Sequence, residues 1–228
     1  FSSLGSDVVP GDINNQRDVF VIDLTTGVRT LVSMNSSGVQ SNAFSSKPFL
    51  SDNGRFVAFE SNATNLGGVT GGEGSKVYWR DTVSGTTTLV ASASSPISSY
   101  VVGMSASGRY VAYVRGDFAL HCFVRNMQSG TVVQADVGMS GQAPNGGVFS
   151  ASLSSDGRYV VFSSTATNLT ADAIAPGSWH VFLRDLELGV TTLITRGPDG
   201  LEAPGTSGDA SISADGRFVA FHSGSQAL

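Results

Sequence analysis

A nine-residue pattern occurs four times along the chain, and each copy joins a polar turn to a run of apolar residues. The copies span 51–59, 105–113, 154–162 and 213–221, and their turn glycines recur at intervals of 49 to 59 residues. Within each run the apolar residues stand at consecutive positions instead of alternating with polar ones. This predicts a strand that is covered on both faces.

A second repeated pattern follows each of the first three copies and also precedes the first one. It spans 18–27, 76–85, 121–130 and 180–189, ends on a glycine, and leads into a short β-branched run such as 87–90 or 191–194. Each complete unit therefore predicts four strands. Tight glycine turns join the first strand to the second and the third to the fourth, because glycine adopts positive φ without a Cβ clash.

A single four-stranded sheet cannot cover both of its faces, so the repeats are expected to stack. We therefore predict an all-β fold, a β-propeller of four-stranded antiparallel blades, with three complete blades and two half-blades. The predicted boundaries are a half-blade at about 1–33, blades at about 45–92, 100–136 and 149–196, and a half-blade at about 209–228. The half-blades either join to close a four-bladed ring or belong to a segment of a larger propeller. The segment is favoured, because 221–228 repeats the register of the first eight residues.

The repeated motifs resemble those of the TolB-like, WD-repeat-like β-propeller family of bacterial proteins. The motifs are the Ser-x-Asp-Gly-Arg-Tyr/Phe-Val-Ala-Phe pattern, the Ala-Thr-Asn-Leu at 63–66 and 166–169, and the Asp-Val-Phe-Val-x-Asp-Leu-x-Thr-Gly pattern. The resemblance covers essentially the whole chain and implies the propeller fold, but blades of this kind serve binding scaffolds, periplasmic assembly proteins and gating domains of peptidases. The third unit departs from the pattern at Ser107 and Asn126 and in its short loop at 115–120.

Composition narrows the classes of partner. The 228 residues are 40% hydrophobic and 14% charged, with a net charge of −5 and lysine only at Lys47 and Lys76. This charge balance argues against nucleic acid binding, and no apolar run approaches the roughly 18 residues that predict membrane insertion. Scarce lysine and abundant Ser, Thr and Gly favour a periplasmic, cell-surface or secreted protein, with a targeting signal absent from this chain.

Long loops are expected on one face of the propeller only. They are the loops between second and third strands and the linkers between blades, at 61–75, 91–104, 134–147, 165–178 and 196–208. Loops on a rigid scaffold commonly carry recognition, and no catalytic motif stands out, since His121 and His180 share one repeat position. We therefore predict a non-enzymatic, extracytoplasmic binding scaffold that recognises a protein or a surface polymer through these loops.

Two alternatives stay open. The blades could form the gating or substrate-binding portion of a larger secreted hydrolase or lyase. They could also form a self-assembling structural fragment, because open half-blades expose strand edges that recruit other chains. This second alternative predicts self-association.

One short segment resembles half of a calcium loop. Asp12, Asn14 and Asp18 place three oxygen-bearing side chains close together, and Ca²⁺ favours clustered oxygen ligands. The segment lacks the glycine and the bidentate glutamate of an EF-hand loop, so the three residues are a weak calcium candidate. No other cofactor is predicted.

Overall fold

The structure is a computed structural model that describes residues 1–68, 74–92, 98–116 and 119–228. The described residues form five antiparallel sheets and one 3-10 turn, η1 (Met139–Gly141). The first sheet contains β1 (Ser2–Ser3), β2 (Asp18–Ile22) and β3 (Arg29–Leu31), and the second contains β4 (Ser45–Leu50), β5 (Phe56–Ser61), β6 (Lys76–Asp81) and β7 (Thr86–Ala91). The third sheet contains β8 (Ser98–Met104), β9 (Tyr110–Gly116), β10 (His121–Asn126) and β11 (Val132–Gln134). The fourth sheet contains β12 (Val148–Leu153), β13 (Tyr159–Ser164), β14 (His180–Asp185) and β15 (Val190–Leu193). The fifth sheet contains β16 (Ser207–Ile212) and β17 (Val219–Ser223).

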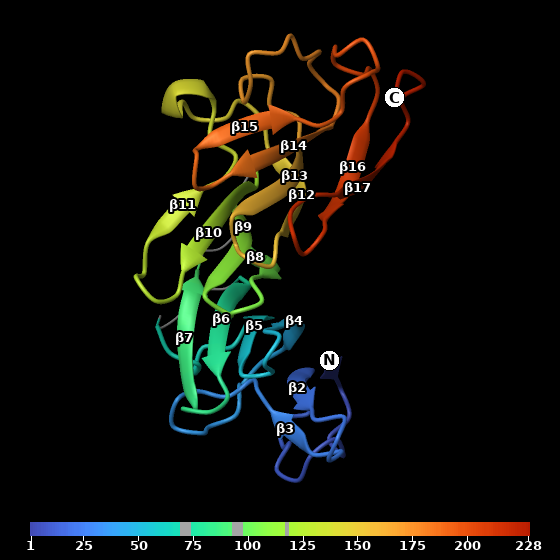
Figure 1. The fold of residues 1–228 in the computed structure, drawn as a ribbon. Coiled ribbons are helices and arrows are strands. Elements are labelled where there is room, and N and C mark those ends of the chain that lie inside the picture. Colours follow the sequence, from blue (N-terminus) through green and yellow to red (C-terminus); the bar gives the residue numbers. More distant parts are fainter. Residues whose placement is uncertain (69–73, 93–97, 117–118) are drawn as a thin grey trace.

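The sheets are blades of a β-propeller. In each sheet the strands lie side by side in chain order, and every pairing is antiparallel. Figure 1 shows the sheets following one another along an arc, with the first sheet at one end and the last at the other. β1–β3 and β16–β17 form separate sheets, so the structure shows an open arc and not the four-bladed ring that was one alternative.

The hydrophobic core lies between successive sheets. In β5, Val57 and Phe59 pack with Val19 of the preceding sheet, whereas Ala58 packs with Val101 of the following sheet. The same alternation recurs in β13. Both faces of these strands are therefore buried, which explains why their apolar residues stand at consecutive positions.

The turns between first and second strands link the blades through their backbones. Asp52 N donates to Ala106 O at 2.9 Å, Ala106 N donates to Ser155 O at 2.8 Å, and Ser155 N donates to Ala214 O at 3.0 Å. These bonds run from one blade to the next, so they fix the position of each turn against its neighbour.

The Ala-Thr-Asn-Leu motif fastens the linkers between blades. Asn65 donates from Nδ2 to Gln40 O at 2.7 Å and accepts from Asn42 N at 3.0 Å. Asn168 makes the equivalent two bonds two blades further along the chain. These asparagines hold the preceding linker against the loop between second and third strands.

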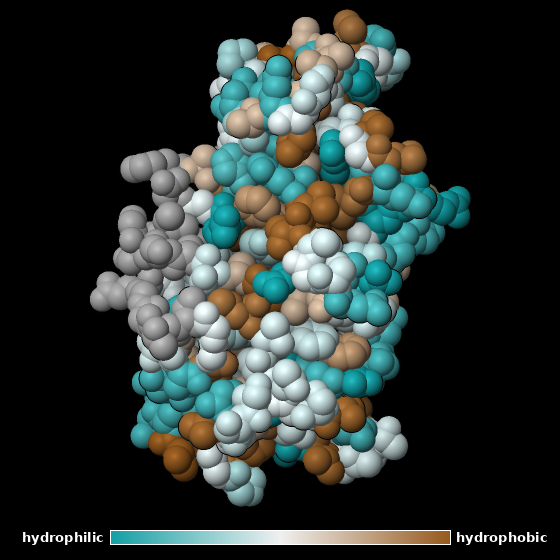
Figure 2. All heavy atoms as spheres, turned by 90° about the vertical axis from the view of Figure 1, so that its left-hand side faces the viewer, coloured by the Kyte–Doolittle hydropathy of each residue, from teal (hydrophilic) through white to brown (hydrophobic). Residues whose placement is uncertain are grey.

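Figure 2 shows the side of the molecule on which β7 and β11 lie in Figure 1. Hydrophobic residues occur there in patches bordered by hydrophilic ones. The exposed apolar residues of β11 are Val132 and Val133, at 47% and 45% exposure. Among the described residues, no helix has the length and apolar character needed to cross a membrane.

Candidate functional site

Two equivalent grooves form where one blade meets the turn of the next. The aromatic residue at the start of the second strand lies beneath the turn glycine of the following blade: Phe56 beneath Gly108, and Tyr110 beneath Gly157. These glycines have φ of +72° and +79°, and a Cβ on them would lie 2.4 Å and 2.3 Å from the ring. Only glycine satisfies both the backbone conformation and the close approach, so the shape of each groove depends on it.

We call the groove above Phe56 the tryptophan groove. Phe56 and Trp79 stack there with ring centroids 4.7 Å apart, and Trp79 Nε1 donates to Gly108 O at 2.9 Å. The remaining space has a volume of about 230 Å³ and is lined by Phe56, Trp79, Ser107, Gly108, Arg109, Met127 and Gln128. The indole ring thus fills much of this groove.

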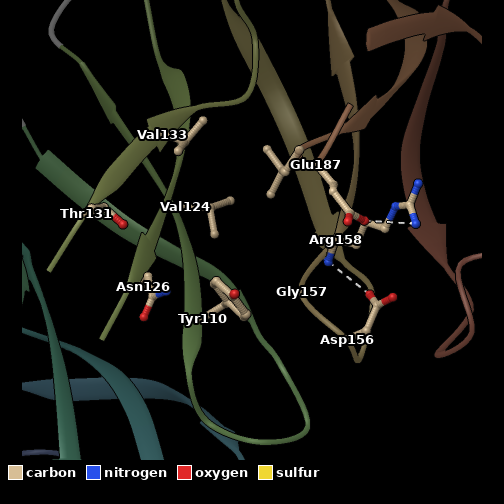
Figure 3. A pocket seen from close by; sticks show the side chains of 10 residues that line it. Tyr110, Val124, Asn126, Thr131, Val133, Asp156, Gly157, Arg158 and Glu187 are labelled. Carbon is tan, nitrogen blue, oxygen red and sulfur yellow. Dashed lines mark hydrogen bonds and ion pairs between the residues drawn. The ribbon is translucent and has the colours of Figure 1, made fainter. Parts of the chain in front are cut away.

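The equivalent groove one blade later, which we call the open groove, has a volume of about 590 Å³. Val124 stands in it where Trp79 stands in the tryptophan groove. It is lined by Tyr110, Val124, Asn126, Thr131, Val133, Asp156, Gly157, Arg158, Leu186 and Glu187. Figure 3 shows Tyr110, Val124 and Val133 on one side and the Asp156–Arg158 turn with Glu187 on the other. A smaller side chain at one repeat position therefore accompanies a much larger cavity.

The rim of the open groove is acidic. Arg158 Nη2 lies 2.6 Å from Asp185 Oδ2, and Arg158 Nη1 lies 3.0 Å from Glu187 Oε2. The hydrogen bond from Arg158 holds the pKa of Asp185 below its usual value. Asp156 and Glu187 are exposed, so the single arginine faces more negative charge than it neutralises.

The blade that supplies Tyr110 and Val124 to the open groove is also the one whose sequence departs from the repeat. In the preceding blade, Arg55 binds Asp81 through Nε at 2.8 Å and Nη2 at 2.7 Å. In this blade, Arg109 Nε meets only the amide oxygen of Asn126, at 3.4 Å. Among the described residues Arg109 has no carboxylate partner, and its guanidinium lies over the Tyr110 ring, 5.3 Å from the ring centroid.

The calcium candidates gather around one glutamine. Gln40 Nε2 donates to Asp12 Oδ1 at 2.8 Å and to Asp18 Oδ2 at 3.0 Å, while Asn14 Nδ2 donates to Ser41 O at 2.8 Å. The side-chain amide of Gln40 thus lies between the two carboxylates and ties the linker to the first sheet. The described residues contain no group of three or more His, Cys, Asp or Glu side chains that could hold a metal ion. The calcium site stays a prediction from the sequence.

The histidines of the shared repeat position each face an acid. His121 Nδ1 lies 2.7 Å from Asp136 Oδ2, and His180 Nε2 lies 3.1 Å from Glu202 Oε1. Burial lowers the pKa of His180. Cys122 is fully buried, and burial raises the pKa of its thiol.

The long loops are described in part. Residues 69–73, 93–97 and 117–118, which belong to the predicted loops at 61–75, 91–104 and 115–120, lie outside the described residues. The loops at 134–147 and 165–178 come together and enclose a cleft of about 620 Å³. We call it the arginine cleft, because Arg184 and Arg196 line it.

Sequence reasoning missed the open groove, although its signal is present. Trp79 and Val124 occupy the same position of the repeat, and a change from a very large to a small side chain marks a difference in packing. The turn glycine that completes the groove comes from the next repeat, so alignment of the repeats alone does not show the contact.

Comparison with known proteins supports the fold. The chain matches no protein-family model, and the comparison with curated proteins found no match. Among solved structures, one from a study of two prolyl endopeptidases has a TM-score of 0.54 and 15% identity, covering 78% of this chain and 26% of that one.

Two further structures have lower scores. TolB from Agrobacterium tumefaciens has a TM-score of 0.48 and 16% identity, covering 92% of this chain and 79% of that one. Oligogalacturonate lyase from Vibrio parahaemolyticus has a TM-score of 0.49 and 10% identity, covering 91% of this chain and 52% of that one. The chain thus spans about a quarter of the peptidase and half of the lyase, and at these identities the likeness concerns the fold alone.

Proposed function

We propose that this chain is a non-enzymatic β-propeller binding module that recognises a protein segment through the open groove. Short turns at 156–158 and 186–187 line this groove, so the proposal moves recognition away from the long loops that the sequence analysis favoured. The observation that carries the proposal is the difference between the two equivalent grooves. Trp79 fills one, whereas Val124 leaves a cavity of about 590 Å³ in the other. Ligand sites commonly have volumes of about 300–1,000 Å³, so the open groove has room for one or two side chains of a partner.

The chemistry of the groove favours a cationic side chain with an apolar stem. Tyr110, Val124 and Val133 supply an apolar wall, and Asp156 and Glu187 supply negative charge at the rim. Long basic side chains bury their methylene groups while their charged heads stay at the surface. A protein segment with arginine or lysine fits this arrangement better than a neutral polymer does.

The lining also favours binding over catalysis. The ten residues that line the open groove include no His, Cys or Ser. The arginine that faces it is engaged by Asp185 and Glu187. Nucleophilic catalysis needs a nucleophile within reach of a base. The lining residues that could serve, Tyr110, Thr131, Asp156 and Glu187, are joined to one another by no hydrogen bond among the described residues.

The experiment compares two substitutions at one repeat position. Thr131 and Thr86 are both exposed, and each follows a turn glycine and contacts a serine hydroxyl, at 2.8 Å and 3.1 Å. Thr131→Trp places an indole in the open groove, whereas Thr86→Trp adds the same ring to the preceding blade. Binding of the wild type and both variants to arrays of peptides and of polysaccharides is then measured.

We expect basic peptides to bind the wild type and Thr86→Trp and to lose at least about tenfold in affinity with Thr131→Trp. Equal binding by all three proteins would contradict the assignment of the groove. Binding to polysaccharides alone would replace the protein segment by a surface polymer.

A gating or substrate-binding role in a larger hydrolase is the second candidate. It is favoured by the likeness to the prolyl endopeptidase structure, of which this chain covers 26%. This role predicts a catalytic domain in the same polypeptide. Sequencing the coding region on both sides of the chain tests it, and a reading frame that contains blades only would contradict it.

The motifs and the composition of the sequence each support a finer proposal. The Ser-x-Asp-Gly-Arg and Ala-Thr-Asn-Leu patterns support membership of the TolB-like family, and scarce lysine supports a periplasmic, cell-surface or secreted location. Fractionation of cells that express the full protein tests the location. Recovery in the cytoplasmic fraction alone would contradict it.

A further inference from the structure

Arg184, which lines the arginine cleft, makes fewer hydrogen bonds than the arginines at the same position of the repeat. Arg80, Arg125 and Arg184 occupy the same position in three successive blades. Arg80 Nη1 donates to Met34 O at 3.0 Å, and Arg125 Nη1 donates to Val90 O at 2.8 Å. Both arginines thereby hold the end of the preceding sheet. Arg184 Nη1 makes a single bond, to Thr191 Oγ1 in its own blade at 3.0 Å.

The linker in front of Arg184 takes a different path. In the earlier blade, Ser36 Oγ accepts from Thr87 N at 2.9 Å and keeps the linker against the outer strand β7. In the later blade, Met139 N donates instead to Asn168 O at 3.0 Å, and Ser140 has a φ of +55° within the turn. The linker thus contacts the loop between second and third strands through its backbone, and the space between it and β15 is the arginine cleft. The equivalent space in the earlier blade, beside β7, has a volume of about 530 Å³.

The unused edge of Arg184 suits a carboxylate. Its Nε is buried and, like its Nη2, donates to no acceptor among the described residues. The buried Nε of Arg125 has no acceptor either, so Arg184 differs from Arg125 in the bonds of its Nη1. Arg55 binds both oxygens of Asp81 with the same two atoms, Nε and Nη2. Such paired hydrogen bonds match the planar geometry of a carboxylate.

Of the two arginines that line the cleft, Arg184 has no carboxylate within ion-pair distance among the described residues, although the charge of neighbouring Asp185 acts on it. Arg196 Nη2 lies 2.7 Å from Asp172 Oδ2, so these two groups neutralise each other. Asp185, the acid next to Arg184 in sequence, is bound by Arg158. Arg184 is half-buried, and a partly desolvated cation is stabilised by a bound anion.

Hydroxyl groups complete the lining. Thr170 is 7% exposed, and its Oγ1 has no hydrogen-bond partner among the described residues. Ser140, Thr191 and Thr192 also line the cleft. A buried hydroxyl without a partner is costly, so a ligand that carries its own hydroxyl groups would compensate for it.

We propose that the arginine cleft binds a small hydroxylated monocarboxylate of the size of a sugar acid. Arg184 binds the carboxylate through its guanidinium group, and the threonine and serine hydroxyls bind hydroxyl groups of the ligand. The cleft volume of about 620 Å³ is within the usual range for such ligands. The arginine cleft and the open groove share no lining residue, so this proposal stands independently of the proposed function.

Amide NMR spectra of the ¹⁵N-labelled chain test the proposal, with three probes at equal ionic strength. Gluconate carries both the carboxylate and the hydroxyl groups, propionate carries only the carboxylate, and sorbitol carries only the hydroxyl groups. We expect gluconate to shift the amides of 137–141, 169–172 and 189–192, propionate to shift them at higher concentration, and sorbitol to leave them unchanged.

The variants separate the contributions of the side chains. Arg184→Gln should weaken gluconate binding by about tenfold or more, and Thr170→Val, which keeps the shape of the side chain, should weaken it by a smaller factor. Arg217→Gln removes the same charge at an exposed position in the last turn and should bind like the wild type. Thr131→Trp, which blocks the open groove, should leave gluconate binding unchanged.

Several results would overturn the proposal. They are an absence of shifts with gluconate, equal binding by wild type and Arg184→Gln, and equal effects of sorbitol and gluconate. Shifts in the same amides with a glutamate-containing peptide but not with gluconate would also overturn it, because the occupant would then be a protein segment.

Discussion

The tryptophan groove and the open groove are built from the same repeat, yet they differ more than twofold in volume, at about 230 Å³ and 590 Å³. Both have an aromatic ring beneath a turn glycine, and both have a turn arginine at the rim. They differ in the third strand, where Trp79 in the first corresponds to Val124 in the second, and in the turns, where Ser107 and Gln128 correspond to Asp156 and Glu187. The comparison shows how a repeated scaffold acquires an individual site: the backbone contacts between blades stay constant while the side chains around the groove change.

The largest effect is expected where the aromatic ring supports the turn. Gly157→Ala should reduce the free energy of unfolding by about 3 kcal/mol, because a Cβ would lie 2.3 Å from the Tyr110 ring and the residue has a positive φ. Gly54 has a similar φ of +71° with nothing within 4 Å of the added Cβ, so Gly54→Ala should cost only about 1 kcal/mol. Urea denaturation measures both. Equal losses would show that the contact with the ring contributes nothing.

A smaller loss is expected when the tryptophan groove is emptied. Trp79→Val should lower the free energy of unfolding by about 2 kcal/mol, because the stack on Phe56 and the bond to Gly108 O are lost. Trp79→Phe keeps a ring on Phe56 and should cost about half as much. If Trp79→Val were as stable as the wild type, the indole would not be the group that fills this groove.

The turn ion pair should matter less, and only above acidic pH. The hydrogen bonds from Arg55 hold the pKa of Asp81 well below its usual value. The contribution of a carboxylate with a lowered pKa is present above its unfolded pKa of about 4 and is lost as the pH falls toward the folded value. Asp81→Asn should therefore lower the midpoint of thermal unfolding at pH 7 and have a shrinking effect below pH 4. A difference that is independent of pH would rule out the ion pair as its cause.

The reverse substitution gives the smallest expected effect. Asn126→Asp supplies Arg109 with the carboxylate that the neighbouring blades have, and exposed pairs of this kind contribute little. The midpoint of thermal unfolding should rise by about 1–2 °C in a calorimetric scan. A decrease would mean that the amide of Asn126 is needed where it is, beside the open groove.

The blades could be predicted from the sequence because each complete repeat contains the strands and turns of one blade. Consecutive apolar residues in β5 and β13 indicate burial on both faces, and the turn glycines have the positive φ that the hairpins require. Within a blade, the strands that pair follow one another along the chain. Their order can therefore be predicted without knowledge of distant contacts.

The sites were harder to predict, because each depends on a contact between repeats. The open groove needs Gly157 of one repeat above Tyr110 of another, and the arginine cleft needs Met139 N to bond to Asn168 O. Neither contact follows from residue type or spacing. The surroundings of the calcium candidates depend on a distant residue in the same way: Asp12 and Asp18 come close together, and Gln40, 22 residues beyond Asp18, lies between them.

The central claim is that the open groove is a binding site, and the most direct test is a footprint on the labelled chain. A basic peptide selected on the array is added to the ¹⁵N-labelled protein, and the amide shifts are mapped. The account predicts shifts at 124–133, 156–158 and 186–187 that disappear in Thr131→Trp and persist in Thr86→Trp. Shifts confined to other blades, or an unchanged map in Thr131→Trp, would contradict it.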